Sequence, residues 1–229
     1  MNSTVDVCIV GGGAAGLFLA ANLSETLRVS VLEKTKKTAS KLLLTGGGRC
    51  NYTRSGNAQE LLEHYNSGKV FLRFALRAMD SQRLVELFLK MGMNSTTDSD
   101  GRVFPKSYSA ADVKSVFTRQ ISARGHAIIL GSQVYKMSLA PNGAFEVICS
   151  SGRILSRRVV IATGGRSYPV TGSSGDGYEL AKTLGHTVET LVPALTDLKI
   201  SDFSLSDLSG VTLEKVTLEL WRNGKKTIQ

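Results

Sequence analysis

Near the start of the chain, two short apolar runs flank a segment whose apolar residues recur at helical spacing. Val5–Val10 is short, rich in β-branched residues and followed by glycine, which predicts a buried parallel strand. Ala14–Thr26 predicts an amphipathic helix, and Arg28–Glu33 predicts a second strand. Strand, helix and strand in this order predict a right-handed βαβ unit with parallel strands.

The middle of the chain changes from a helical pattern to a strand pattern. Gln59–Met91 predicts two helical stretches, Asn94–Gly101 a polar loop, and Ala110–Arg124 a further helix. Ala127–Leu130 and Val159–Ala162 then predict buried strands. The remaining expected elements are strands at 134–139, 145–150 and 153–157, which form an antiparallel meander, and a helix at 176–184.

The pattern changes again near Val192–Pro193, where we expect a domain boundary. Residues 211–221 alternate between apolar and polar positions, and Asn223-Gly224 is a typical hairpin turn. The expected organisation is one domain over residues 1–192 and the start of a β-rich second domain over residues 193–229.

Composition narrows the expected partners. The formal net charge is +9, but the Lys and Arg residues are scattered, so we expect a solvated surface rather than a nucleic-acid partner. No apolar stretch reaches transmembrane length, and no membrane partner is expected. The three cysteines include no CxxC pair, which favours neither a disulfide framework nor a metal site and fits a reducing cytoplasm.

The sequence Gly11–Gly16 matches the pattern G-x-G-x-x-G directly after a predicted strand and at the start of a predicted helix. In this context Gly11 allows a tight turn, Gly13 lets a pyrophosphate approach the backbone, and Gly16 lets the helix pack on the strand. The helix N-terminus offers unpaired N–H groups and a partial positive charge to phosphates. The segment is therefore expected to bind a dinucleotide.

Glu33 ends the second predicted strand, where a carboxylate accepts hydrogen bonds from an adenosine ribose in this kind of unit. A 2′-phosphate at that position would face a like charge. The acid therefore favours FAD or NAD over NADP.

Three longer segments resemble a known family. Asp6–Gly16 resembles the start of two-dinucleotide-binding-domain flavoproteins, in which this site takes FAD. Lys41–Asn51, with its Gly-Gly-Gly-Arg-Cys-Asn, and Val159–Gly177 are similar to the two signatures of the aminoacetone-oxidase-type flavoproteins. That mostly bacterial family also includes a reductase of unsaturated oxo bile acids. Gly101–Pro105 fits the same family, so the resemblance covers nearly the whole chain.

The resemblance implies a fold and a chain organisation. It implies an α/β fold in which a Rossmann-like FAD-binding domain, with a parallel sheet and an antiparallel β-meander, is interrupted by a β-rich substrate domain. It also implies that residues 45–51 lie along the flavin side of the cofactor. A third FAD segment should follow the substrate domain, and because none is visible before Gln229, the chain is expected to be truncated.

The fingerprint, the acid at the end of the second strand and the resemblance together predict a cofactor-binding set. No metal ligands are predicted, and no catalytic acid or base stands out. The predicted set is Gly11, Gly13, Ala14, Ala15, Gly16, Glu33, Lys34, Lys41, Gly47, Gly48, Arg49, Cys50, Asn51, Val134, Ala162, Thr163, Gly164, Gly165 and Asp176.

Several of these residues, and one neighbour, have a second interpretation. Arg49 suits a contact to a phosphate or reduced flavin, or a solvated side chain; Asn51 suits a flavin edge or a turn. Asp176 suits a ligand contact or a helix cap, and Tyr168 suits a position beside the flavin or a packing role. Cys50 is a lone cysteine in its loop, which favours packing over nucleophilic chemistry.

The expected function is that of an FAD-dependent oxidoreductase that transfers a hydride through bound flavin. Its partner would be a small-molecule substrate, with NAD(P)H as a candidate electron donor. The alternatives are an NAD-linked dehydrogenase, or an RNA-associated FAD-binding module without activity in this chain. The identity of the substrate is left open.

Overall fold

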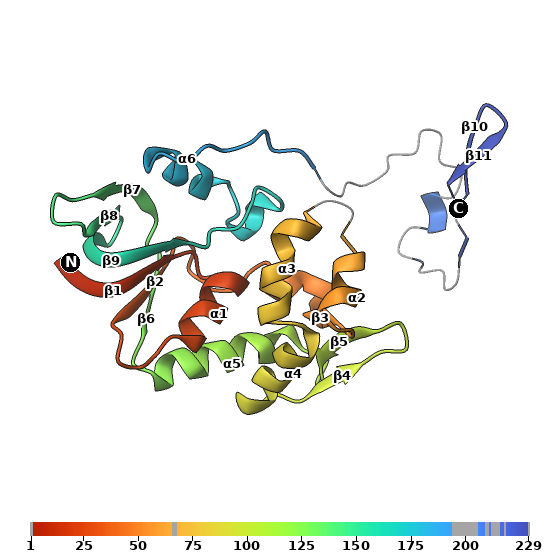
Figure 1. The fold of residues 1–229 in the computed structure, drawn as a ribbon, viewed down its shortest axis with the longest axis horizontal. Helices are drawn as coiled ribbons and strands as arrows, with labels where there is room; N and C mark the ends of the chain where they lie inside the picture. Colours follow the sequence, from red (N-terminus) through yellow and green to blue (C-terminus); the bar gives the residue numbers. More distant parts are fainter. Residues whose placement is uncertain are drawn as a thin grey trace. The chain divides into compact units, whose positions relative to one another are not determined.

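The computed structural model describes residues 2–65, 68–193, 206–208, 211, 216–217 and 219–228 (Figure 1). The chain divides into two compact units, Met1–Val188 and Glu189–Gln229. Each unit is described by itself.

The predicted βαβ unit is confirmed. It consists of β1 (Asn2–Val10), α1 (Ala14–Asn22) and β2 (Val29–Glu33), and β1 pairs with β2 in parallel. The helix is shorter than predicted because Leu23 is already extended, with φ −73° and ψ 149°, and its N–H donates to the Leu19 carbonyl. The residues that follow turn back toward β2 instead of continuing the helix.

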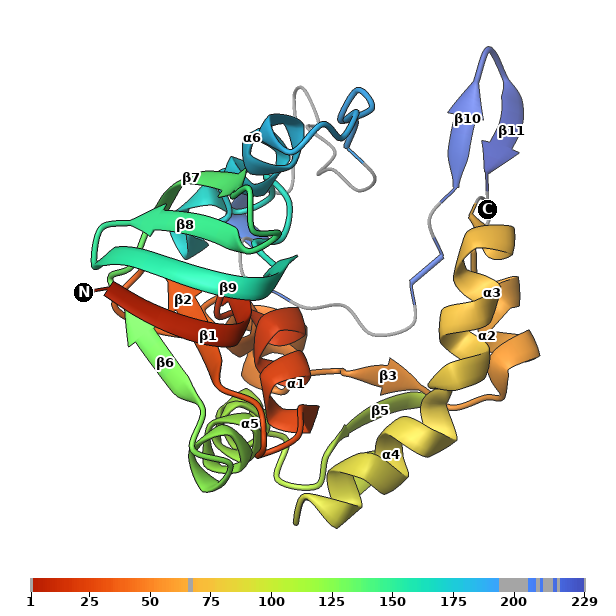
Figure 2. The ribbon, with the colours of Figure 1, turned by 60° about the vertical axis from the view of Figure 1, so that its left-hand side comes forward.

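The main sheet has six strands in the order β6-β2-β1-β9-β8-β7. Strands β6, β2, β1 and β9 are parallel, and β8 and β7 continue the sheet as the predicted antiparallel meander (Figure 2). The α/β class with a parallel sheet and a meander is thereby confirmed. The other four strands of this sheet are β6 (Ala127–Leu130), β7 (Val134–Leu139), β8 (Phe145–Cys149) and β9 (Gly152–Ile161).

Two strand predictions need correction. The strands predicted at 153–157 and 159–162 are one continuous strand, β9, because pairing with β1 keeps the same register from Arg153 to Ile161 across the polar pair Arg157-Arg158. The strand β6 was predicted to be buried but lies at the edge of the sheet, where Leu130 is 47% exposed. An apolar run alone does not distinguish an edge strand from a central one.

Three helices occupy the region for which two were predicted: α2 (Ala58–Glu63), α3 (Lys69–Ala78) and α4 (Ser81–Lys90). Asn57 starts α2 with a capping box, and Asp80 caps α4, so local side-chain bonds divide the run. The predicted polar loop contains a strand. A small antiparallel sheet forms from β3 (Thr53–Arg54), β5 (Arg102–Pro105) and β4 (Ser95–Thr97).

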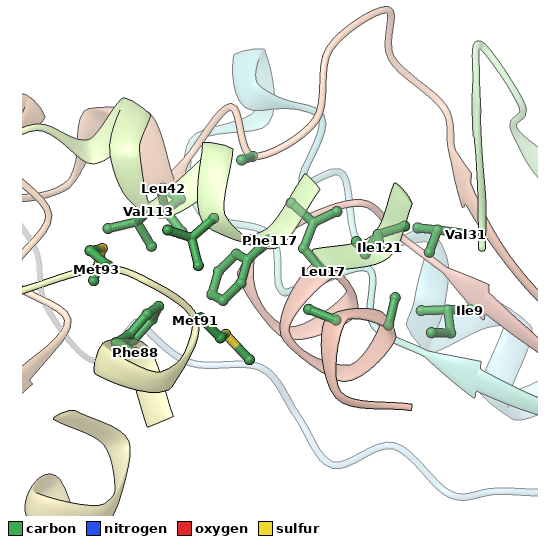
Figure 3. Packing of buried hydrophobic residues seen from close by; sticks show 14 of the residues in the cluster. Ile9, Leu17, Val31, Leu42, Phe88, Met91, Met93, Val113, Phe117 and Ile121 are labelled. Carbon is green, nitrogen blue, oxygen red and sulfur yellow. The ribbon is translucent and has the colours of Figure 1, made fainter. Parts of the chain in front are cut away.

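One hydrophobic core joins the main sheet to this helical region (Figure 3). Phe117 of α5 (Ala110–Ala123) lies 6.0 Å from Phe18 of α1 and 5.6 Å from Phe88 of α4, measured between ring centroids. Leu42 and Cys50 belong to the same core, so the segment Lys41–Asn51 is anchored in it near both of its ends. A second cluster covers the other face of the sheet and includes Leu180 of α6 (Asp176–Thr183).

The second unit contains the predicted hairpin. Strands β10 (Leu220–Arg222) and β11 (Lys225–Ile228) are antiparallel, and Asn223 and Gly224 both have positive φ, 51° and 70°, as the turn sequence predicts. A short 3-10 helix, η3 (Ser206–Leu208), precedes it. Residues 212–215 and 218 of the alternating run at 211–221 lie outside the described residues, and the assignment to a substrate domain stays a prediction.

Candidate functional site

Two glycines of the fingerprint are required by the packing of the turn itself. A Cβ atom on Gly11, whose φ is +111°, would lie 2.4 Å from the Ala162 carbonyl oxygen at the end of β9. A Cβ atom on Gly16 would lie 2.0 Å from the Gly11 carbonyl oxygen. The backbone of the glycine loop between β1 and α1 therefore packs directly against the end of β9 and against the start of α1. Neither Gly11 nor Gly16 leaves room for a side chain.

Gly13 is different because its neighbourhood is open. It is the N-terminal cap residue of α1, and a Cβ atom there would meet no heavy atom within 4 Å. No side chain caps this helix. The first N–H groups of α1 are thus presented to a space that can hold an anion, which is the arrangement that binds a diphosphate.

The Glu33 carboxylate organises the neighbouring loop. Its Oε2 accepts a hydrogen bond from the Gly12 N–H at 2.8 Å, and its Oε1 accepts from the N–H and the hydroxyl of Thr35, each at 2.8 Å. A carboxylate has about four acceptor positions, so one remains, on Oε2. Glu33 has room for a ribose hydroxyl, but it also holds the glycine turn in place.

A pocket runs over the carboxyl ends of β2, β1 and β9. In a parallel sheet this edge is where ligands bind. Nine residues of the predicted set line it: Gly11, Gly13, Glu33, Lys34, Lys41, Val134, Ala162, Thr163 and Asp176. The lining also includes residues outside the predicted set: Gly12 of the fingerprint, residues 171–175 of the second signature, and Lys37, Ser40, Ser132 and Gln133, which belong to no motif.

The other members of the predicted set do not line this pocket. Ala14, Ala15 and Gly16 form the first turn of α1 behind the glycine turn. Gly164 and Gly165 follow the lining residue Thr163. The remaining members lie in or directly after η1 (Leu42–Gly48): Gly47, Gly48, Arg49, Cys50 and Asn51.

The segment after Lys41 has an unusual backbone. Gly46, Gly47 and Gly48 have φ values of 56°, 65° and 86°, a run that residues with side chains rarely adopt. The Arg49 side chain is not a loose solvated arm, because its Nε donates to the Gly46 carbonyl at 3.0 Å and its guanidinium lies 5.1 Å from the Phe104 ring centroid. The loop is therefore preformed by its own contacts.

Cys50 and Asn51 have roles within this segment. Cys50 is buried, and desolvation raises the pKa of its thiol even though a hydrogen bond with Thr45 opposes the shift. This supports the packing interpretation. In the orientation that satisfies both ends of its amide, Asn51 donates to the carbonyls of Thr53, at 2.7 Å, and Val103, at 3.2 Å, which is a turn role.

Asp176 and the two lysines of the predicted set bind other parts of the protein. Lys34 Nζ lies 2.8 Å from Asp176 Oδ2 and also contacts the Ser174 hydroxyl. Burial acts to raise the Asp176 pKa, but hydrogen bonds from Lys34 and Ser174 outweigh it, so the pKa lies below its usual value. The cap of α6 is Gly175, so Asp176 is not a cap, and Lys41 Nζ donates to the Ser167 carbonyl at 2.7 Å.

Some kinds of site are absent from the part of the chain that the structure describes. There, no group of three or more His, Cys, Asp or Glu side chains is placed to hold a metal ion. No helix in that part is long and apolar enough to cross a membrane.

The sheet order, the tight glycine turn and the acid at the end of β2 together define a Rossmann-type dinucleotide-binding protein. The chain belongs to the HI0933-like family, whose Rossmann-domain model matches residues 5–224. This is a family of FAD-binding oxidoreductases, so the predicted family and the predicted cofactor, FAD, are confirmed.

The relatives with curated names have different substrates. The chain is 31% identical over 206 residues to a 3-dehydro-bile acid delta(4,6)-reductase of Clostridium scindens, a match covering 89% of this chain and 49% of that protein. It is 30% identical over 182 residues to a ribosomal RNA dihydrouridine synthase of Haemophilus influenzae, covering 77% of this chain and 44% of that protein. The chain thus spans about half the length of the curated relatives it matches.

A solved structure shows the same fold. The open conformation of a flavocytochrome c3 fumarate reductase matches with a TM-score of 0.53 at 20% identity, covering 80% of this chain and 40% of that one. At this identity the likeness shows the fold alone.

Proposed function

We propose that this chain holds the ADP portion of FAD for a reductase whose substrate carries a carbon–carbon double bond conjugated to a carbonyl group. The observation that carries the FAD site is the presence, in one pocket, of the open turn at Gly13 and the remaining acceptor position of Glu33. The helix N-terminus suits the diphosphate, and the carboxylate suits a ribose hydroxyl.

The substrate class is supported by what the curated relatives have in common. A 3-dehydro-bile acid with double bonds at positions 4 and 6 is a conjugated dienone. Formation of dihydrouridine saturates a ring double bond beside a carbonyl. Both reactions add a hydride to an electron-poor alkene carbon, which is chemistry that reduced FAD supplies when bound. The residues of this chain contribute binding and orientation of the cofactor.

The alternatives drawn from the sequence gain less support. No feature of the described residues favours an NAD-linked dehydrogenase over a flavoprotein. An RNA-associated role would require strongly salt-dependent RNA binding by this chain. The similarity to two ribosomal RNA dihydrouridine synthases is not evidence of such binding. NAD(P)H stays a candidate electron donor.

The first experiment is to purify the chain, record its visible spectrum and identify what denaturation releases. We expect FAD. The protein is then reduced with dithionite without oxygen and mixed with a steroidal 4,6-dien-3-one, with the saturated 3-ketone as the matched control.

Reoxidation of the flavin by the dienone and not by the ketone would support the substrate class. Release of no FAD would contradict the cofactor site. Bound FAD that the dienone does not reoxidise would contradict only the substrate class.

A further inference from the structure

The loop between β9 and α6, residues 164–175, contributes its C-terminal half to the pocket lining; we call it the return loop. Two lysines from the segment after β2 tie it down, Lys41 at the Ser167 carbonyl and Lys34 at Ser174 and Asp176. A Cβ atom on Gly172 would lie 2.9 Å from Thr35 Cγ2, which shows how closely the two segments approach. Residues 171–175 of the return loop line the pocket directly.

Tyr168 in this loop has no packing role. Its side chain is 70% exposed, and its neighbour Val170 is 96% exposed. Its backbone has φ 54° and ψ 65°, a left-handed conformation that is unfavourable for an aromatic residue. The conformation is held by Thr171, whose N–H and hydroxyl donate to the Tyr168 carbonyl at 2.9 and 2.7 Å. Tyr168 is not itself a lining residue, but it lies in the loop whose residues 171–175 line the pocket. Local strain held in place beside a pocket is typical of a residue that meets a ligand.

The sheet order shows which part of FAD Tyr168 would meet. Glu33 follows β2, the Gly13 turn follows β1, and Tyr168 follows β9, which lies on the opposite side of β1 from β2. With the ribose at Glu33 and the diphosphate at Gly13, the remainder of FAD extends toward β9. The tether from Lys41 to Ser167 fixes the residue next to Tyr168 on that side.

We propose that Tyr168 contacts the isoalloxazine ring of bound FAD and covers it with its phenol ring. The inference rests on the proposed FAD site and adds a residue to it. A flat, exposed aromatic ring gains from a contact with a flat aromatic cofactor, because ring pairs prefer centroid separations of about 4.5–7 Å. Tyr168 is then a positioning residue for the flavin end of the cofactor.

The test compares the fluorescence of bound FAD in the wild type and in Tyr168→Phe. A phenol in contact with isoalloxazine quenches its fluorescence by electron transfer, whereas a phenyl ring of the same shape does not donate an electron readily. We expect Tyr168→Phe to raise the fluorescence lifetime about twofold or more, while FAD affinity changes less than about twofold because ring stacking is kept. Tyr168→Asn should also lose affinity, by about 2- to 10-fold.

The matched control is Tyr135→Phe. Tyr135 is 60% exposed on β7, an edge strand separated from β1 by β9 and β8, whereas Tyr168 follows β9, the strand next to β1. It should leave the lifetime unchanged. FAD bound with identical lifetimes in the wild type and in Tyr168→Phe would overturn the role of Tyr168 alone. A wild-type chain that binds no FAD would overturn the FAD site as well.

Discussion

Lys34 and Asp176 are 142 positions apart in the sequence, yet Lys34 Nζ lies 2.8 Å from Asp176 Oδ2. The pair joins the residue after β2 to the first residue of α6, and both residues line the pocket. The two side chains are about a quarter exposed, so the pair is more than a solvated surface contact. It closes one end of the return loop over the pocket.

The ion pair between Lys34 and Asp176 should make the free energy of unfolding depend on pH in the acidic range. The Asp176 pKa is lowered in the folded state, so its contribution to the free energy of unfolding is present above the ordinary Asp pKa of about 3.9 and is lost as pH falls below it. We expect the wild type to lose more stability than Asp176→Asn between about pH 5 and pH 3. Urea unfolding at each pH measures the difference.

A double-mutant cycle with Lys34→Met gives the control for this prediction. The single changes at Lys34 and Asp176 should each remove the pair, and the double variant should be less destabilised than the sum of the two. Additive effects with an unchanged pH profile in Asp176→Asn would show that the two side chains do not stabilise each other.

Local signals explain why the βαβ unit was predictable and the contact between the segment after β2 and the start of α6 was not. The strands, the turn at Gly11 and the acid Glu33 lie within one short stretch, and each is encoded by neighbouring residues. The contact between Lys34 and Asp176 depends on the whole sheet order, for which a single sequence carries no periodic signal. For the same reason β6 was predicted as buried although it lies at the edge of the sheet.

The pocket residues divide in the same way into those that a local sequence signal identified and those that it did not. The signature residues Ala162 and Thr163 do line the pocket, because they follow a strand whose end was recognisable. Ser132 and Gln133 also line it but belong to no motif, and they reach the pocket only because β6 and β7 flank it. Their position between the strand β6 and the meander is the one sequence signal that could have pointed toward them.

Substitutions at two fingerprint glycines should have different effects: one should weaken FAD binding and the other should lower the stability of the fold. Gly13→Val places its side chain in open space, so the free energy of unfolding should fall by about 1 kcal/mol or less, while FAD affinity falls at least about 100-fold. Gly16→Ala creates a clash with the Gly11 carbonyl and should destabilise the protein without cofactor by about 1–3 kcal/mol. Thermal unfolding without FAD and titration with FAD measure the two effects. Equal destabilisation by both variants would contradict the open space at Gly13.

Glu33→Ala should have two effects because the carboxylate has two roles. Loss of the acceptor for Gly12 and Thr35 should cost about 1–3 kcal/mol of stability without cofactor. Loss of the ribose contact should weaken FAD by a further amount of about 1–3 kcal/mol. Thr35→Val is the matched control, since it removes one hydroxyl bond to Glu33 and leaves the ribose acceptor in place. If both variants weaken FAD equally, Glu33 supports the loop and does not bind ribose.

The three cysteines should be unreactive in the folded protein. All are buried, desolvation raises the pKa of Cys8 to about 12, and desolvation also raises the pKa of Cys50. The reactive species is the thiolate, so at pH 8 a thiol reagent should label almost no cysteine in the time that labels all three in denaturant. The Cys50→Ala variant should keep its FAD, since the packing role needs only a small apolar side chain. Rapid native labelling that disappears in Cys50→Ala would show that Cys50 is an exposed, activated thiol and that the packing interpretation is wrong.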